Sequence, residues 1–95
     1  MLLHTNFELL EKKAEVLKNM GHPIRLSIIE LLSQHEKLTV TEIYTELSIE
    51  QAVASHHLRI LKNSGILQSQ KDGKKAYYSI KSPHIKTIFS LLVAF

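Results

Sequence analysis

Apolar residues repeat with the period of an α-helix within residues 47–67, LSIEQAVASHHLRILKNSGIL. Side chains at positions i, i+4, i+7 and i+8 share one side of a helix, so they predict a face buried in a core. In this stretch they are Val53, His57, Ile60 and Leu61. Gly65 follows, and glycine often adopts the left-handed conformation that ends a helix.

The positions between these residues point away from the core and carry short polar side chains or a cation. Hydroxyl, amide and imidazole groups of this size reach base edges in a DNA major groove, and lysine and arginine bind phosphates. We therefore expect this face to contact DNA. Its members are Gln51, Ala52, Ser55, His56, Arg59 and Lys62.

Three further helices are expected upstream of this one. Thr5 and Glu8 have the spacing of a capping box, which predicts a helix from the cap at Thr5 to Gly21. Pro23 suits the first position of a second helix. The polar residues 33–37 separate it from a short third helix, which begins at a second capping box.

That capping box is formed by Thr39 and Glu42, and Ser48 with Gln51 has the spacing of another. The short third helix and the helix after Gln51 are separated by only a few residues. Two helices joined by a tight turn form a helix-turn-helix.

A β-hairpin is predicted after this motif. Residues 66–71 and 75–80 have strand character, and Asp72-Gly73 between them is a strong signal for a tight turn. A helix-turn-helix followed by such a hairpin makes a winged helix. We expect three lysines on the hairpin to contact DNA phosphates or the minor groove; they are Lys71, Lys74 and Lys75.

The last helix, after Ser82-Pro83, is apolar on nearly all sides. Such a helix exposes a large apolar patch on a monomer, so burial against the first and last helices of a second chain is the economical arrangement. The side chains expected in this dimer interface are Leu3, Phe7, Leu10, Ile85, Ile88, Phe89 and Leu92.

The length of 95 residues predicts one domain over residues 1–95. The fold class expected is mainly α with a small β-hairpin. The absence of cysteine excludes disulfides and thiolate metal sites. No apolar run is long enough for a membrane span and no signal peptide is visible, so we expect a cytoplasmic protein.

The basic residues gather in the second part of the chain. The net charge is +3, but residues 1–58 hold five basic and eight acidic residues, whereas residues 59–95 hold seven basic and one acidic. A cluster of this kind is typical of a phosphate-binding surface.

The segment EQAVASHHLRILKNSGIL resembles the recognition helix of the ArsR/SmtB family of bacterial repressors, whose usual form is SQSxVSHHLxxLxxxGLV. The resemblance extends to LKNMGHPIRLSIIELL upstream and SQKDGKKAYYSI downstream. It implies a two-fold dimer held by the first and last helices, with His56 facing DNA and His57 packed inward. Glu50 departs from the family pattern, which has serine there, and a carboxylate repels a phosphate at that place.

His22 and Arg25 lie in the His-Pro-x-Arg element that the family shows. Because they precede a core helix rather than the recognition helix, we expect them to be structural. Metal-sensing members place cysteines at the start of the third helix, where this chain has Thr39 and Thr41, or ligands along the last helix, where it keeps only His84. One histidine of four ligands does not hold zinc, so no metal and no cofactor is expected.

The sequence lacks a glycine-rich phosphate loop and a nucleophile with a placed base, so an enzyme is not expected. We expect a homodimeric transcriptional repressor that binds double-stranded DNA at an inverted-repeat operator. Its effector is left open between a small apolar molecule, another protein and none. The alternative is a winged-helix module that binds another protein through its apolar last helix.

Overall fold

Helices dominate the chain, and one small sheet completes it. The computed structural model describes residues 6–95. The elements in order are α1 (Phe7–Met20), α2 (Pro23–Ser33), β1 (Leu38–Thr39), α3 (Val40–Glu46), α4 (Gln51–Asn63), β2 (Leu67–Asp72), β3 (Lys75–Ile80) and α5 (Pro83–Ala94). The predicted class, mainly α with a β-hairpin, is confirmed.

The sheet has three antiparallel strands in the order β1-β3-β2, one more than the sequence predicted. The added strand β1 contributes only Leu38 and Thr39, which pair with Tyr78 and Tyr77 of β3. Two residues are too short for a period-2 pattern, so β1 gave no sequence signal. Pairing to β3 places the start of α3 beside the hairpin.

The predicted hairpin is confirmed, with the turn shifted by one residue. Asp72 pairs with Lys75, so the two turn residues are Gly73 and Lys74 rather than Asp72-Gly73. Gly73 has a φ of +66°, a conformation that glycine adopts without steric penalty.

Capping follows the prediction at one helix and departs from it at two. Thr39 and Glu42 form the expected box, because Glu42 N donates to Thr39 Oγ1 at 3.1 Å and Thr39 N donates to the Glu42 carboxylate at 2.9 Å. At α1 the predicted cap at Thr5 is wrong, since Asn6 is the N-cap and accepts from Leu9 N at 2.7 Å. Thr5 itself lies outside the described residues.

The predicted box of Ser48 with Gln51 is also wrong. Ser48 has a φ of +54° and lies in the turn that leaves α3, where its N–H donates to Thr45 O at 3.2 Å. The residue that precedes α4 as N-cap is Glu50, whose side chain makes no capping hydrogen bond. The turn between the two helices contains one residue in the left-handed conformation, and Ser48 occupies that position rather than the N-cap of α4.

The core lies where α2, α3, α4 and β2 meet. Its fully buried large side chains are Ile28, Ile29, Leu32, Ile43, Leu58, Leu61, Ile66 and Leu67. On α4 the buried side is rotated slightly from the predicted stripe: His57 and Leu61 are buried as expected, whereas Val53 and Ile60 are only half-buried. Ala54 and Leu58 take the central positions because α4 packs against α2, α3 and β2 together.

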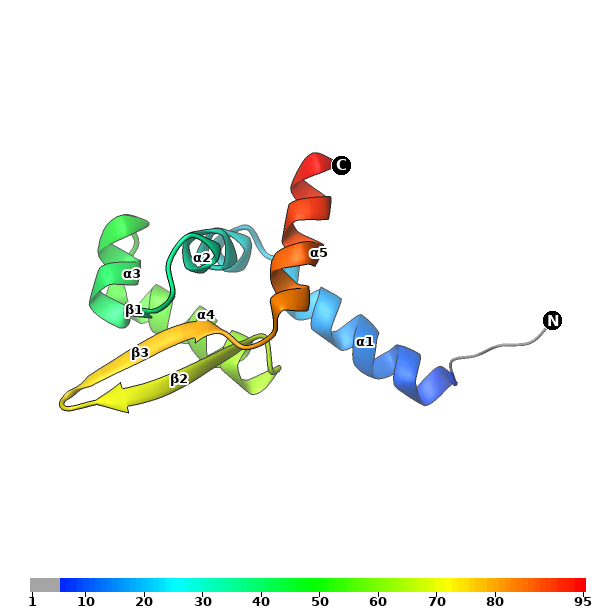
Figure 1. Ribbon diagram of the computed structural model, residues 1–95, viewed down its shortest axis with the longest axis horizontal. Helices are drawn as coiled ribbons and strands as arrows, with labels where there is room; N and C mark the ends of the chain where they lie inside the picture. The colour runs from blue at the N-terminus through cyan, green and yellow to red at the C-terminus, as the bar shows by residue number, and fades with distance from the viewer. Residues whose placement is uncertain (1–5) are drawn as a thin grey trace.

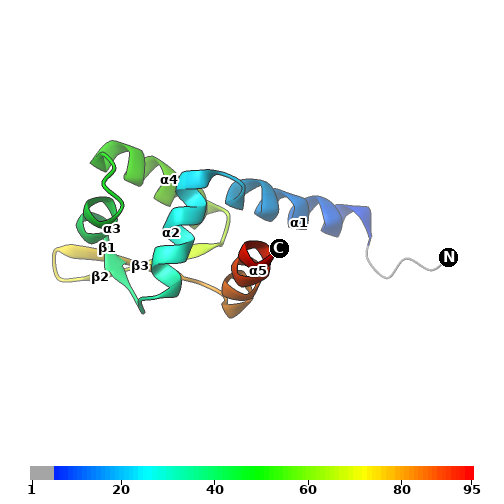
Figure 2. The ribbon, with the colours of Figure 1, turned by 90° about the horizontal axis from the view of Figure 1, so that it is seen from above.

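Different elements lie at the two ends of the molecule. Figure 1 shows α1 and α5 at one end, and α3 with the tip of the hairpin at the other. Figure 2, seen from above, shows α1 extending away from the other helices. Within residues 6–95, no helix is both long and apolar enough to cross a membrane.

Candidate nucleic-acid interface

The outer face of α4 carries the side chains that the sequence assigned to it. Gln51, Ala52, His56, Arg59 and Lys62 are exposed, and Ser55 is half-buried. The opposite side of the same helix is anchored by Ala54, Leu58 and Leu61 in the core. One rigid helix therefore presents an amide, a hydroxyl, an imidazole and two cations to solvent.

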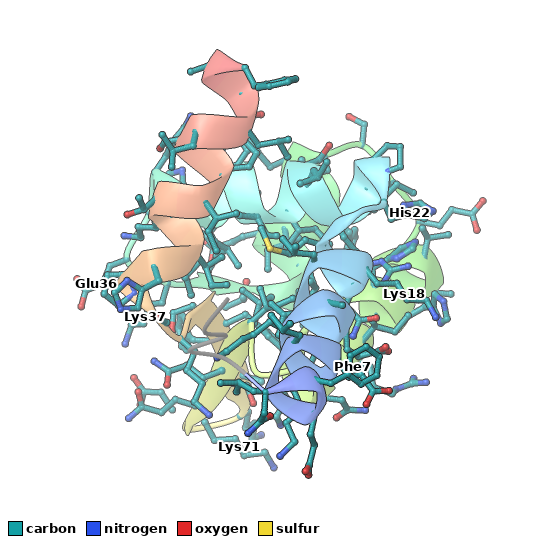
Figure 3. All side chains as sticks on the ribbon, turned by 90° about the vertical axis from the view of Figure 1, so that its right-hand side faces the viewer. Phe7, Lys18, His22, Glu36, Lys37 and Lys71 are labelled. Carbon is teal, nitrogen blue, oxygen red and sulfur yellow. The ribbon has the colours of Figure 1, made fainter. Side chains whose placement is uncertain are left out.

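The hairpin β2–β3 packs beside α4 through β2. Its three lysines, Lys71, Lys74 and Lys75, are all exposed, and Lys74 lies in the turn itself. Lys71 is labelled on the hairpin in Figure 3. This arrangement, a polar helix face flanked by a lysine-bearing hairpin, matches the requirements for binding a duplex: groups for base edges and cations for phosphates.

Sequence reasoning missed one cation beside the hairpin. Lys37 Nζ lies 4.7 Å from the centre of the Tyr77 ring. With Lys74, Lys75 and Glu42 it lines a groove of about 660 Å³ between the start of α3 and the hairpin. Only the pairing of β1 with β3 brings Lys37 there, so no signal in the sequence indicated it.

Glu50 lies at the start of the candidate DNA-binding face, with an exposed side chain. Glutamate is unusual at an N-cap, because the preferred caps are short side chains that accept a hydrogen bond from the second or third helical N–H. Here the side chain makes no such bond, so the helix begins without this stabilisation.

A histidine pair supports α4 from behind. His57 is 6 % exposed, and its ring centre lies 4.5 Å from that of His22 at the corner between α1 and α2. His22 Nδ1 accepts a hydrogen bond from Ile24 N at 3.1 Å and so caps α2. Arg25 donates to Asn19 O at 3.0 Å. The expected structural roles of His22 and Arg25, and the inward packing of His57, are confirmed.

The pKa of His57 is lowered below its ordinary value, first by burial and then by the nearby charges of His22, His56 and Arg25. Burial disfavours the charged imidazolium, and each of the three neighbours repels it when charged. Both effects favour the neutral form of the His57 imidazole.

A second surface, at the end formed by α1 and α5, is apolar. Of the side chains predicted for the dimer interface, Phe7 is 75 %, Leu10 50 % and Leu92 51 % exposed. Ile88 and Phe89 are half-buried against the core. Ile85 is 6 % exposed and packs within the chain's own core, which leaves it little surface for a partner. Leu3 lies outside the described residues.

The same end exposes apolar side chains that the prediction did not assign to the interface: Leu9, Leu17, Leu91, Val93 and Phe95. Figure 3 views this end directly and shows that both α1 and α5 lie on it. Exposed aliphatic and aromatic side chains gathered at one end of a molecule are typical of a surface that binds another protein chain.

Metal-ligating side chains are not gathered into a site in the described part of the chain. No three His, Cys, Asp or Glu side chains among residues 6–95 are placed to hold a metal ion.

Comparison with known proteins shows which family shares this sequence and fold. Residues 22–69 match the model described as bacterial regulatory protein, arsR family. An uncharacterised HTH-type transcriptional regulator of Methanocaldococcus jannaschii, MJ1325, is 40 % identical over 82 residues, which cover 86 % of this chain and 92 % of that protein. The transcriptional repressor PagR of Bacillus anthracis is 40 % identical over 83 residues, covering 87 % and 83 %.

Solved structures agree. The crystal structure of PagR superposes with a TM-score of 0.84 over 92 % of this chain and 99 % of that one, at 38 % identity. The homodimeric winged helix-turn-helix DNA-binding domain Mb0332 of Mycobacterium bovis gives 0.84 over 99 % and 88 %, at 28 % identity. The chain is thus a winged helix-turn-helix. It belongs to the arsR family of bacterial regulatory proteins, and is a transcriptional regulator rather than an enzyme.

The stability of the fold is expected to fall in mild acid because His57 is buried. Its pKa in the folded chain lies below the unfolded value of 6.5, so the unfolded state binds more protons as the pH falls through that value. The free energy of unfolding should be highest above about pH 7 and decline below about 6.5, by at most about 1.4 kcal/mol per pH unit for this site. Urea unfolding across that range measures it.

The control distinguishes His57 from the other histidines. His57→Gln is expected to flatten the dependence of unfolding free energy on pH, whereas His84→Gln, at an exposed position of α5, should leave it unchanged. Equal slopes in the wild type and both variants would contradict the assignment.

Proposed function

We propose that this regulator is a homodimeric repressor that binds an inverted-repeat operator, with α4 in the major groove and the hairpin β2–β3 on the adjacent backbone. The observation that carries the proposal is the exposed polar face of α4 beside three exposed hairpin lysines. In helix-turn-helix proteins the second helix of the motif lies in the major groove, and its N-terminal residues contact base edges.

The side chains of α4 then divide by chemistry. Gln51 suits adenine, whose N6 and N7 pair with an amide; Ser55 suits either base edge; His56 suits a purine or a phosphate. Arg59 and Lys62 position the helix through phosphates, as do Lys71, Lys74 and Lys75 on the hairpin.

The apolar end of the molecule supports the dimer. Phe7, Leu10 and Leu92 are each at least half exposed, and a second copy is the partner that covers them by two-fold symmetry. A relative of the same fold, Mb0332, is described as homodimeric. Two-fold symmetry places two copies of α4 at half-sites about one helical turn apart, or a multiple of it.

The base contacts of Ser55 and His56 can be removed together. Because each good base contact contributes about 1–3 kcal/mol of discrimination, Ser55→Ala with His56→Ala should reduce the preference for the operator over a scrambled duplex by about tenfold or more. Competition binding against both duplexes measures the ratio. The same residue types occur on α5, so Ser90→Ala with His84→Ala is the matched control. Unchanged preference in the α4 variant would overturn the assignment.

The dimer is expected to depend on Leu92. Leu92→Glu buries a charge in the interface, which should give monomers at concentrations where the wild type is dimeric. Sedimentation velocity measures the change. Ser90→Glu is the control, because residues two apart on a helix point about 160° away from each other. A Leu92→Glu variant that remains dimeric would contradict the interface.

Salt dependence tests the hairpin and separates DNA binding from a protein-binding role of the same fold. Each phosphate contact adds about 0.9 to the slope of log affinity against log salt. With one such contact in each of two chains, Lys74→Gln should lower the slope by about 1.8. Lys86→Gln on α5 should not change it. Wild-type binding that is weak and insensitive to salt would favour a module that binds protein.

A further inference from the structure

The recognition helix α4 touches the corner between α1 and α2 through two histidines whose rings are in contact. His57 of α4 is 6 % exposed and its ring centre lies 4.5 Å from that of His22, with the ring planes inclined at 41°. His22 is the last residue before α2, and α1 ends two residues earlier. The contact therefore connects α4 to both helices of the N-terminal part.

A second proton on His22 costs a hydrogen bond, and a proton on the buried Nδ1 of His57 finds no acceptor among the described residues. His22 Nδ1 accepts from Ile24 N at 3.1 Å, so this nitrogen carries no proton in the folded chain. An imidazolium has a proton on both ring nitrogens and accepts no hydrogen bond, so a doubly protonated His22 cannot cap α2. His57 Nδ1 is buried and has no hydrogen-bond partner within the described residues.

The groups around the pair are cationic or become so in acid. Arg25 of α2 and His56 of α4 are the other charged or titratable groups that act on His57, and no carboxylate is among them. The His56 ring centre lies 5.0 Å from that of His57. The Nε atom of Arg25 is buried without a partner in the described part of the chain. None of these groups offers a negative charge to a proton on His57.

We propose that the His22–His57 contact is an acid-operated latch on the recognition helix: protonation of the pair separates α4 from the α1–α2 corner and weakens DNA binding. The proposal rests on the proposed function. The chain is otherwise expected to bind DNA more tightly in acid, because exposed histidines such as His56 gain positive charge beside the phosphates. A loss of DNA affinity in acid therefore distinguishes the proposed effect of the histidine pair from this general electrostatic effect.

An operator duplex is first obtained by in-vitro selection of bound duplexes from a random pool. The affinity of the chain for this duplex is then measured between about pH 7.5 and about pH 5.5 at constant salt. Wild-type affinity should fall across this range, by at most about tenfold per pH unit for each proton that the pair takes up. His22→Asn is the test variant, because asparagine caps helices well and does not titrate. It should bind like the wild type at the higher pH and lose less affinity in acid than the wild type, because only His57 of the pair remains to be protonated. His84→Asn, on exposed α5, should keep the wild-type profile.

The outcomes separate this latch from the proposed function. Wild-type affinity that is constant or rises in acid overturns the latch, and so does a fall that is as steep in His22→Asn as in the wild type. Absence of sequence-specific binding even at the higher pH overturns the proposed function as well.

If His22→Asn does not fold, hydrogen exchange of the wild type decides instead. After correction for intrinsic rates, protection of the α4 amides should decrease in acid more than protection of the α3 amides. Equal changes in the two helices overturn the latch.

Discussion

Burial of one side of α4 is the constraint on which the rest of the structure depends. Ala54, Leu58 and Leu61 fill the space between α2, α3 and β2, and this leaves the opposite side of the helix to solvent. A helix of 13 residues is marginal alone in water, so its conformation depends on this packing rather than on propensity. The groups proposed to read DNA are therefore held by side chains that never touch it.

The end of the molecule formed by α1 and α5 is largely outside this core, so its apolar side chains remain exposed. Helix α1 buries only Met20 fully, and α5 buries only Ile85. The remaining apolar side chains of both helices cover no core of their own chain, although burial of each such side chain is favourable. In the homodimer proposed above, a second copy covers this surface and sets the distance between two recognition helices, so that arrangement would link stability and operator geometry through one interface.

The histidine pair lies between these two regions. His22 caps α2 and its ring contacts that of His57, so the corner that follows α1 is in direct contact with the recognition helix. Its sequence motif was visible, and a structural role for His22 was expected because it precedes a core helix. The pairing with His57 was not visible, because the two residues are far apart in the chain and nothing in either local pattern requires them to meet.

Local chemistry determined much of this protein from its sequence alone. Three features depend only on neighbours within a few positions: the amphipathic repeat of α4, the Thr39–Glu42 capping box and the tight turn at Gly73. Such interactions are the same in any fold that contains the segment, which is why α4, α3 and the hairpin could be predicted. The exposed positions of Gln51 and His56 follow from the helical periodicity of α4. The gathering of basic residues after residue 58 can be read directly from the sequence.

Tertiary structure alone decided what depends on distant partners. Strand β1 exists because β3 offers it hydrogen bonds, and it brings Lys37 to the ring of Tyr77. Ser48, with a φ of +54°, lies in the turn between α3 and α4 instead of capping α4, whose N-cap is Glu50. Ile85 turned toward its own core while Leu92, on the same helix, remained exposed. A sequence pattern states that a side chain is apolar, but only the packed chain decides which surface buries it.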